Sequence, residues 1–84
     1  MYNILRLNNE LLKKLKKYSL QKKFEKQLAL FSKNQRHPSL HLELLEPKKH
    51  GIYSFRIDRK FRALLIFRTE ISSIEILNIT LHYQ

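Results

Sequence analysis

The second half of this 84-residue chain contains side chains that could together cut an RNA strand. Attack by a 2′-hydroxyl group on the neighbouring phosphate needs a base for the hydroxyl proton and an acid for the leaving 5′-oxygen. It also needs cations where charge builds on the phosphate oxygens, and arginine supplies paired, planar donors that suit phosphate. Histidine titrates near neutral pH and suits the role of acid. The candidate residues are Arg56, Arg62, His82, Tyr83 and either Glu43 or Glu46.

Each candidate also has a purely structural interpretation. The two arginines could be ordinary solvated residues of a sheet, because arginine is usually exposed. His82 lies where chain ends commonly fray, and Tyr83 could simply hold that tail against the sheet. Glu43 could be a charge partner across two strands, and Glu46 a turn residue.

Composition excludes several classes of protein. The chain has no cysteine, which removes disulfide scaffolds, iron–sulfur sites and cysteine-type zinc sites. The histidines at 37, 41 and 50 lack the close spacing of a metal motif, so we expect no metal and no other cofactor. The single glycine excludes a glycine loop around a nucleotide phosphate. No apolar run approaches the roughly 18 residues of a membrane span, and the N-terminal residues are charged too early for a signal peptide. We therefore expect a cytoplasmic protein without membrane contact.

Positive charge dominates the chain, with 17 Lys and Arg against 7 Asp and Glu and a net charge of +10. Residues 1–36 hold ten of the basic side chains and only two of the acidic ones. A basic surface is typical of nucleic-acid binding, although lysines on helices are often just a solvated face. The expected contacts to RNA or the ribosome are Lys13, Lys16, Lys17, Lys22, Lys23, Lys48 and Lys49.

Hydrophobic periodicity predicts a single α+β domain over residues 1–84. Strands are expected at 2–7, 40–45, 52–57, 61–67 and 73–81. Helices are expected at 9–18, capped by Asn8 or Asn9, and at 20–33, capped by Ser19. Each helix must bury one apolar stripe, and the sheet must bury one face. The expected fold therefore has an N-terminal strand and a two-helix hairpin packed on one face of a twisted, mostly antiparallel sheet of four to five strands.

Alternation along the two central strands predicts where the candidate arginines point. Phe55 and Ile57 belong to one face, and Arg56 to the other. In the next strand the apolar face is formed by alternate residues from position 61, and Arg62 has the opposite parity. If the aromatic sets lie beneath the helices, Arg56 and Arg62 emerge together, exposed, on the open face of the sheet.

Three short motifs give the chain a family resemblance. Residues 37–40 read HPSL, residues 51–57 read GIYSFRI, and residues 59–64 read RKFRAL. In this order and spacing they resemble the RelE/ParE superfamily of type II toxins. The final residues LHYQ resemble the His-Tyr ending of the YoeB-like branch. The resemblance covers essentially the whole chain and implies a RelE-like fold, with two helices on a twisted, mostly antiparallel sheet.

The resemblance also implies roles for the candidate residues. Arg62 matches the arginine that contacts the scissile phosphate, and Arg56 the basic residue that supports the phosphate or the transition state. His82 matches a general acid and Tyr83 a stacking or proton-relay group. The general base matches Glu43 in one alignment and Glu46 in another, and strand parity favours Glu43. Two departures are the absence of a second arginine over residues 78–81 and a tyrosine, rather than tryptophan, before the serine of the second motif.

Two kinds of function follow from this resemblance. The first is a metal-independent, ribosome-dependent mRNA endonuclease, an mRNA interferase, whose partners are the ribosome, mRNA and a small acidic antitoxin protein. The second is a non-enzymatic protein, either a ParE-like toxin that poisons DNA gyrase or a degenerate module that binds only an antitoxin or RNA. The His-Tyr ending favours the endonuclease.

Overall fold

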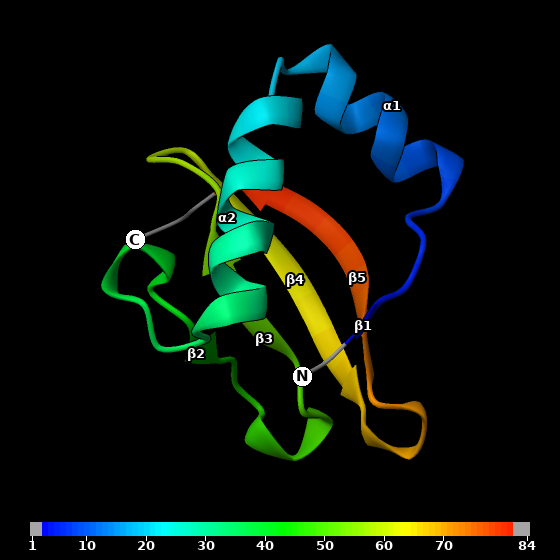
Figure 1. Ribbon diagram of the computed structural model, residues 1–84, viewed down its shortest axis with the longest axis vertical. Helices are drawn as coiled ribbons and strands as arrows, with labels where there is room; N and C mark the ends of the chain where they lie inside the picture. Colours follow the sequence, from blue (N-terminus) through cyan, green and yellow to red (C-terminus); the bar gives the residue numbers. More distant parts are fainter. Residues whose placement is uncertain (1–2, 82–84) are drawn as a thin grey trace.

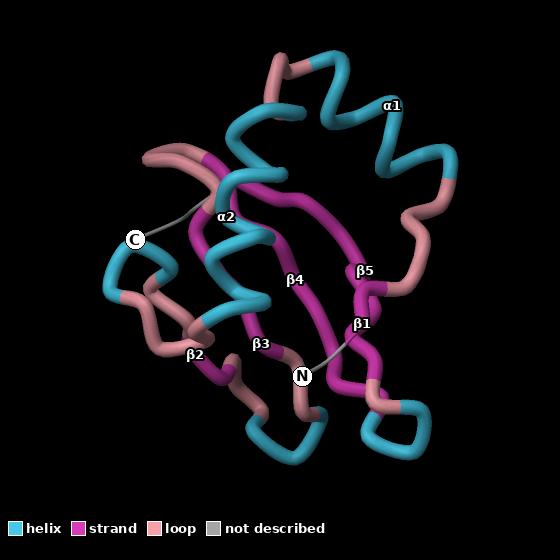
Figure 2. The backbone as a smooth tube through the Cα atoms, in the orientation of Figure 1, coloured by secondary structure: helices cyan, strands magenta, loops and turns pink. Residues whose placement is uncertain are grey.

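The structure is a computed structural model that describes residues 3–81 of the chain. Two helices, α1 (Asn9–Lys17) and α2 (Gln21–Lys33), pack against one five-stranded sheet (Figure 1). The strands are β1 (Asn3–Ile4), β2 (Glu43–Leu44), β3 (Tyr53–Arg56), β4 (Phe61–Arg68) and β5 (Ser73–Leu81). Single 3-10 turns at Pro38–Leu40, Lys48–His50 and Thr69–Ile71 lie in the connections (Figure 2). The expected α+β architecture, with two helices on a five-stranded sheet, is confirmed.

The order of strands in the sheet is β1-β5-β4-β3-β2. Strands β2 to β5 pair antiparallel, and only the short β1 runs parallel to its neighbour β5. A register shift between Leu64 and Leu65 interrupts the long β4–β5 ladder. In the β3–β4 pair, Arg56 lies directly opposite Arg62. Directly opposed residues share a face of the sheet, so the two arginines start from the same face.

The helix hairpin is built from local signals that the sequence shows only in part. The side chain of Asn8 accepts a hydrogen bond from the backbone N–H of Leu11 at 2.9 Å and caps α1 as expected. Ser19 does not cap α2, because its φ of 55° places it in the left-handed region. The N–H groups of Ser19 and Leu20 bond the carbonyls of Lys16 and Leu15, which is the Schellman ending of α1. Ser19 is thus occupied in ending the first helix, and α2 starts without a side-chain cap.

The hydrophobic core lies between the helices and one face of the sheet. The rings of Phe24 and Phe31 in α2 lie 6.2 Å and 5.6 Å from the ring of Phe55 in β3. On the strands, the buried apolar residues are Phe55, Ala63, Leu65, Ile74, Ile76 and Ile79. The alternation expected for β3 and β4 is therefore confirmed on the face that packs against α2. Among residues 3–81, no helix has the length and apolar content needed to cross a bilayer.

The outer strands are shorter than their composition predicts. The first strand is limited to Asn3–Ile4, and the strand expected at 40–45 shrinks to Glu43–Leu44. Leu40 instead ends the 3-10 turn Pro38–Leu40 and is fully buried. The backbone then turns through His41, whose φ is 46°, before it reaches β2. Leu40 thus fills the core from a turn rather than from a strand.

Candidate functional site

Arg62 is the centre of a hydrogen-bonded cluster on the sheet face opposite α2. From β4, its Nε donates to the Oγ of Ser54 at 3.0 Å, and one Nη donates to the carbonyl of His41. The same Nη lies 3.5 Å from the Oε1 of Glu43 on β2. We call Arg62, Ser54, Glu43 and the His41 carbonyl the Arg62 cluster. Its members come from β4, β3, β2 and the turn that leads into β2.

The expectation that Arg62 is exposed is wrong, since the residue is only 6% exposed. Parity correctly places Arg62 away from the aromatic core, but that face is not open at this position. The segment from His41 to Glu43 lies alongside the guanidinium and supplies an acceptor and a counter-charge. Substitution of Arg62 is therefore not a surface change, because it would leave partners of a buried group without their hydrogen bonds.

Opposing effects act on the pKa of the Arg62 guanidinium. Burial lowers the pKa of the Arg62 guanidinium, the nearby Glu43 carboxylate raises it, and the positive charge of Arg56 lowers it further. The net shift is downward, yet arginine stays protonated in proteins near neutral pH because its ordinary pKa is so high. Arg62 is therefore a fixed, largely desolvated cation at the centre of the cluster.

The structure brings Glu43, and not Glu46, to Arg62. Glu43 is in β2, paired with Ser54, and its side chain is 56% exposed while one oxygen faces the guanidinium. Glu46 is exposed in the loop before Pro47 and forms no ion pair with any residue in the range 3–81. A half-exposed carboxylate beside a fixed cation can accept a proton from a ligand in solvent, so of the two only Glu43 has the position of a base in this cluster.

Arg56 differs from Arg62 because it ends its strand and remains partly exposed. It lines a groove of about 350 Å³ between α2 and the turn that joins β3 to β4. We call this the basic groove; its lining residues are Lys23, Lys26, Gln27, Ser39, Arg56, Ile57, Asp58 and Arg59. The positive charge of Arg56 contributes to the lowered pKa of the Arg62 guanidinium, so the two arginines repel each other.

Asp58 is the only acidic residue of the basic groove, and it organises the β3–β4 turn. Its Oδ1 accepts the backbone N–H groups of Lys60 and Phe61, both at 2.8 Å, and its Oδ2 lies 3.2 Å from the Nζ of Lys23. Burial raises the pKa of Asp58, but the bonds from Phe61, Lys60 and Lys23 outweigh it and the net shift is downward. Asp58 is thus an ionised carboxylate whose oxygens are used within the protein.

The structure describes His37 and His41 near the candidate site, but not His82. His82 and Tyr83, the expected acid and its neighbour, lie outside the described residues. His37 is engaged in the turn after α2, where its Nδ1 accepts the backbone N–H of Ser39 at 3.2 Å and lies 2.9 Å from the Oγ of Ser39. His41 contributes its carbonyl to the Arg62 cluster, and its exposed side chain lines a separate cavity with His37.

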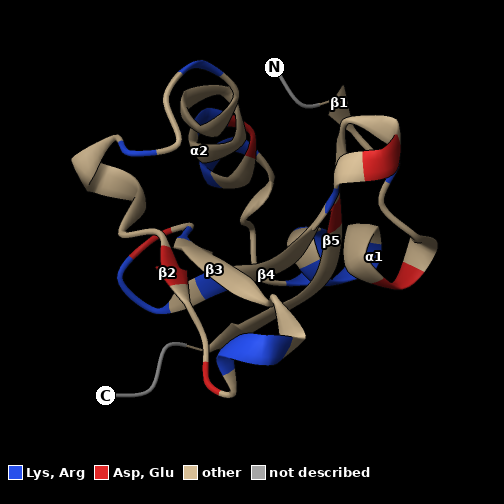
Figure 3. Cartoon of the chain, turned by 90° about the horizontal axis from the view of Figure 1, so that it is seen from below, with Lys and Arg blue, Asp and Glu red and all other residues tan. Residues whose placement is uncertain are grey.

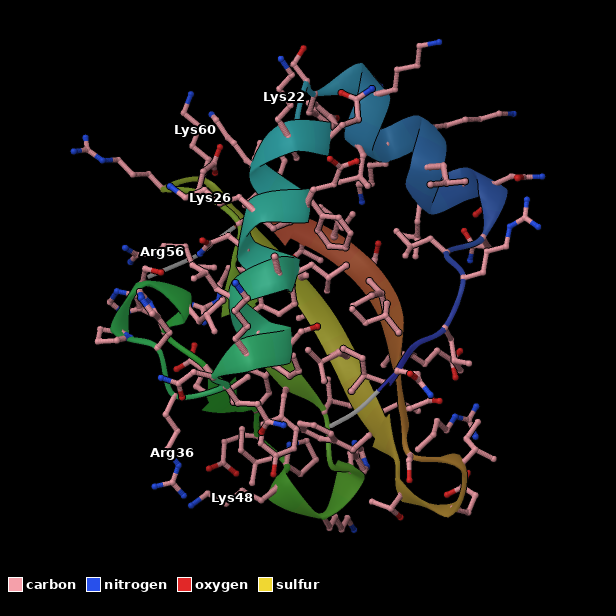
Figure 4. The ribbon with its side chains drawn as sticks, viewed as in Figure 1. Lys22, Lys26, Arg36, Lys48, Arg56 and Lys60 are labelled. Atoms are coloured by element: carbon pink, nitrogen blue, oxygen red, sulfur yellow. The ribbon has the colours of Figure 1, made fainter. Side chains whose placement is uncertain are left out.

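The expected RNA-contacting lysines come from three elements of the fold. All seven are exposed, but Lys13, Lys16 and Lys17 belong to α1, Lys22 and Lys23 to α2, and the last two to the 3-10 turn Lys48–His50. Figure 3 shows basic positions on both helices. In Figure 4 the labelled Lys22, Lys26, Lys60 and Arg56 project along the same side of the molecule. The basic groove lies on that side, away from α1.

Sequence reasoning missed the residues that hold the site together. Gln27 is a buried amide that donates to the carbonyls of Ser39 at 3.1 Å and Arg56 at 2.8 Å, so it ties α2 to β3. A signal existed, because Gln27 is a polar residue within the apolar stripe of α2. Ser54 carries no such signal, since a serine on the outward face of a strand looks solvated. Ser54 belongs to the site only because the guanidinium of Arg62 is oriented toward its hydroxyl group.

Within residues 3–81, no three side chains of His, Asp or Glu gather as a group that could hold a metal ion. The polar groups of the Arg62 cluster and the basic groove include arginines, lysines, serine hydroxyl groups and the Glu43 carboxylate. In comparisons with known proteins, no family model matches the chain and no curated protein matches it.

Proposed function

We propose that this chain is an endoribonuclease, the toxin of a type II toxin–antitoxin pair, which cuts mRNA on the ribosome in the cytoplasm. The observation that carries the proposal is the pairing of Glu43 with Arg62. A half-exposed carboxylate lies 3.5 Å from a buried, hydrogen-bonded cation, and the partly exposed Arg56 starts from the same face of the sheet. Base and cations of the kind that RNA cleavage needs are thus close together.

In this mechanism, Glu43 accepts the proton of a 2′-hydroxyl group as its oxygen attacks the adjacent phosphorus. The new O2′–P bond forms while the P–O5′ bond breaks, which gives a 2′,3′-cyclic phosphate and a 5′-hydroxyl end. We assign to His82 the role of general acid, which donates a proton to the leaving 5′-oxygen. Tyr83 follows it in the chain. Positive charge near the phosphate oxygens stabilises the transition state more than the substrate.

The two arginines have different tasks in the proposal. Arg62 donates hydrogen bonds from its Nε to Ser54 and from one Nη to the carbonyl of His41. It is therefore a positioning residue, which holds Glu43 and adds positive charge to the site. Arg56 is partly exposed, and its guanidinium is the one suited to paired hydrogen bonds with a phosphate. The proposal thus exchanges the roles that the family resemblance implies, in which Arg62 contacts the scissile phosphate and Arg56 supports it.

The remaining support is the agreement between fold and resemblance. Two helices on one face of a mostly antiparallel sheet are compatible with the RelE-like fold that residues 37–64 suggest. The net charge of +10 favours rapid association with an acidic partner. We therefore include in the proposal a small antitoxin with an acidic segment, and the ribosome and its mRNA as the site of action.

A second candidate is favoured by the burial of Arg62. Because this guanidinium is committed to acceptors within the protein, the cluster could be purely structural, and the chain would then bind without cutting. Such a protein would be a ParE-like toxin directed at gyrase, or a module that binds only an antitoxin or RNA. Catalysis at Glu43 separates the two candidates.

The test uses the full chain with ribosomes that translate a defined mRNA, and it maps the ends of the cleaved message. Glu43→Gln should slow cleavage by roughly 10²–10⁴-fold, because the amide cannot act as a base. Its oxygen can still accept from Arg62, so the fold should persist. Glu46→Gln is the matched control and should cut like the unmodified protein. Full cleavage by Glu43→Gln, or no cleavage by the unmodified chain, would refute the endonuclease proposal.

A further inference from the structure

The basic groove gathers four basic side chains between α2 and the turn that joins β3 to β4. Four of its eight lining residues are basic, Lys23, Lys26, Arg56 and Arg59, against the single carboxylate of Asp58. That carboxylate already accepts two backbone N–H groups and Lys23. Lys26, Arg56 and Arg59 form no ion pair with any residue of the described chain. The groove therefore presents three cations that are not engaged in an ion pair within residues 3–81.

The walls of the groove are held at a fixed spacing. Gln27, only 6% exposed, donates to the carbonyls of Ser39 and Arg56 and so ties α2 to the end of β3. On the other wall, Asp58 closes the β3–β4 turn and its contact with Lys23 joins that turn to α2. The basic side chains project from this frame, which reduces the ordering that a ligand must impose on the backbone.

We propose that the basic groove binds the phosphate backbone of single-stranded RNA, with Lys26 and Arg59 as contacts that extend the strand from Arg56. The inference rests on the proposed function for the identity of the strand, since Arg56 lines the groove and also starts from the face of the Arg62 cluster. A strand whose scissile phosphate lies at Arg56 would place neighbouring phosphates along α2. Lys26 and Arg59 then determine how tightly the strand is held.

The composition of the groove favours RNA over an acidic protein segment. A segment that folds on binding needs apolar anchors, and the only apolar lining residue, Ile57, is itself 4% exposed. Phosphate contacts need only cations and donors, which the groove supplies from both walls. An acidic peptide in the groove is the alternative outcome of the test.

The experiment measures binding of a short, 2′-O-methylated oligouridine, which cannot be cut by 2′-hydroxyl attack, to the full chain over a range of salt concentrations. The double variant Lys26→Ala with Arg59→Ala removes two exposed cations of the groove. Each phosphate contact to a single strand adds about 0.7 to the slope of log affinity against log salt, so the slope should fall by about 1.4. The matched control is Arg6→Ala with Lys33→Ala, two exposed cations outside the groove, which removes the same charge and should leave the slope unchanged.

Equal slope changes in the two double variants would overturn the inference, because the effect would then be one of net charge. An oligoglutamate that binds as tightly as the RNA, and loses affinity in the groove variant alone, would assign the groove to an acidic protein partner instead. The cleavage assay keeps the two proposals apart. If the chain fails to cut mRNA but shows the predicted slope change, the endonuclease proposal fails and the RNA groove stands.

Discussion

Arg62 and Arg56 lie directly opposite each other on adjacent strands, and yet they belong to two different environments. Arg62 is enclosed by Ser54, His41 and Glu43 and is 6% exposed. Arg56 is partly exposed at the end of β3 and faces a groove that contains three further basic residues. The same side chain thus serves in one place to fix neighbouring groups, and in the other it is available to a ligand.

The difference arises from the edge of the sheet rather than from the strands that carry the arginines. The segment from His41 to Glu43 contacts the guanidinium of Arg62, and β2 pairs with β3 only at Tyr53 and Ser54, before the chain reaches Arg56. Burial makes hydrogen bonds at Arg62 costly to lose, whereas exposure makes contacts at Arg56 sensitive to salt. Substitutions in the Arg62 cluster should therefore change mainly the free energy of unfolding, and substitutions in the basic groove should change mainly the affinity for a ligand.

The largest effect is expected from Arg62→Ala. The change leaves the Ser54 hydroxyl and the His41 carbonyl without a partner, and it removes the counter-charge of Glu43. We expect a loss of about 3 kcal/mol in the free energy of unfolding, which is a fall in Tm of at least about 12 °C for a domain of this size. Thermal and urea unfolding of the full chain measure it.

Arg56→Ala is the matched control, because it removes the same side chain from the opposite position of the ladder. Its free energy of unfolding should change by no more than about 0.5 kcal/mol, as for most surface substitutions. Equal stability of the two variants would contradict the distinction between the two environments. Lost activity in Arg62→Ala alone does not identify a catalytic group, since the fold is affected too.

A smaller effect is expected from Gln27→Ala. Two carbonyl groups, of Ser39 and Arg56, lose their donor in a place that water reaches poorly. We expect a loss of about 2 kcal/mol in unfolding free energy, with weaker RNA binding because the groove walls are no longer tied together. Gln21→Ala, at an exposed position of the same helix, is the control and should change neither quantity. A Gln27→Ala protein as stable as the control would remove the argument for a fixed groove.

The smallest effect concerns pH. The pKa of Asp58 is lower in the folded chain than its ordinary value, so its contribution to stability is present above the unfolded pKa and is lost as pH falls through the folded one. The advantage of the unmodified protein over Asp58→Asn should therefore shrink below about pH 4. Asn keeps an oxygen for the N–H groups of Lys60 and Phe61, which preserves the turn. Denaturant unfolding at several pH values measures this, with Glu25→Gln at an exposed position as the control. The same pH dependence in both variants would contradict the prediction.

The central strands could be predicted because their burial is regular. Along β3 to β5, one face must be apolar at every second position, and the sequence shows this for Phe55, Ala63 and Leu65. The strand expected at 40–45 was wrong because burial in this segment is not regular. Leu40 is buried from a 3-10 turn, and a two-residue strand carries too few positions to show a period.

The shared face of the two arginines could be predicted from the sequence, but their different environments could not. Parity placed Arg56 and Arg62 on one face, and the preference for Glu43 over Glu46 agrees with the ion pair. Parity cannot show that the segment from His41 to Glu43 closes over Arg62, because this cover comes from a distant part of the chain. The ties made by Gln27 depend on the same long-range packing.

The most direct test of the central claim is the chemistry of the RNA ends that the full chain produces on translating ribosomes. Attack by the 2′-hydroxyl, with Glu43 as base, predicts upstream fragments that end in a 2′,3′-cyclic phosphate and downstream fragments that begin with a 5′-hydroxyl. Both products should fade together in Glu43→Gln and persist in Glu46→Gln. Fragments with 3′-hydroxyl and 5′-phosphate ends, or an intact message, would contradict the account.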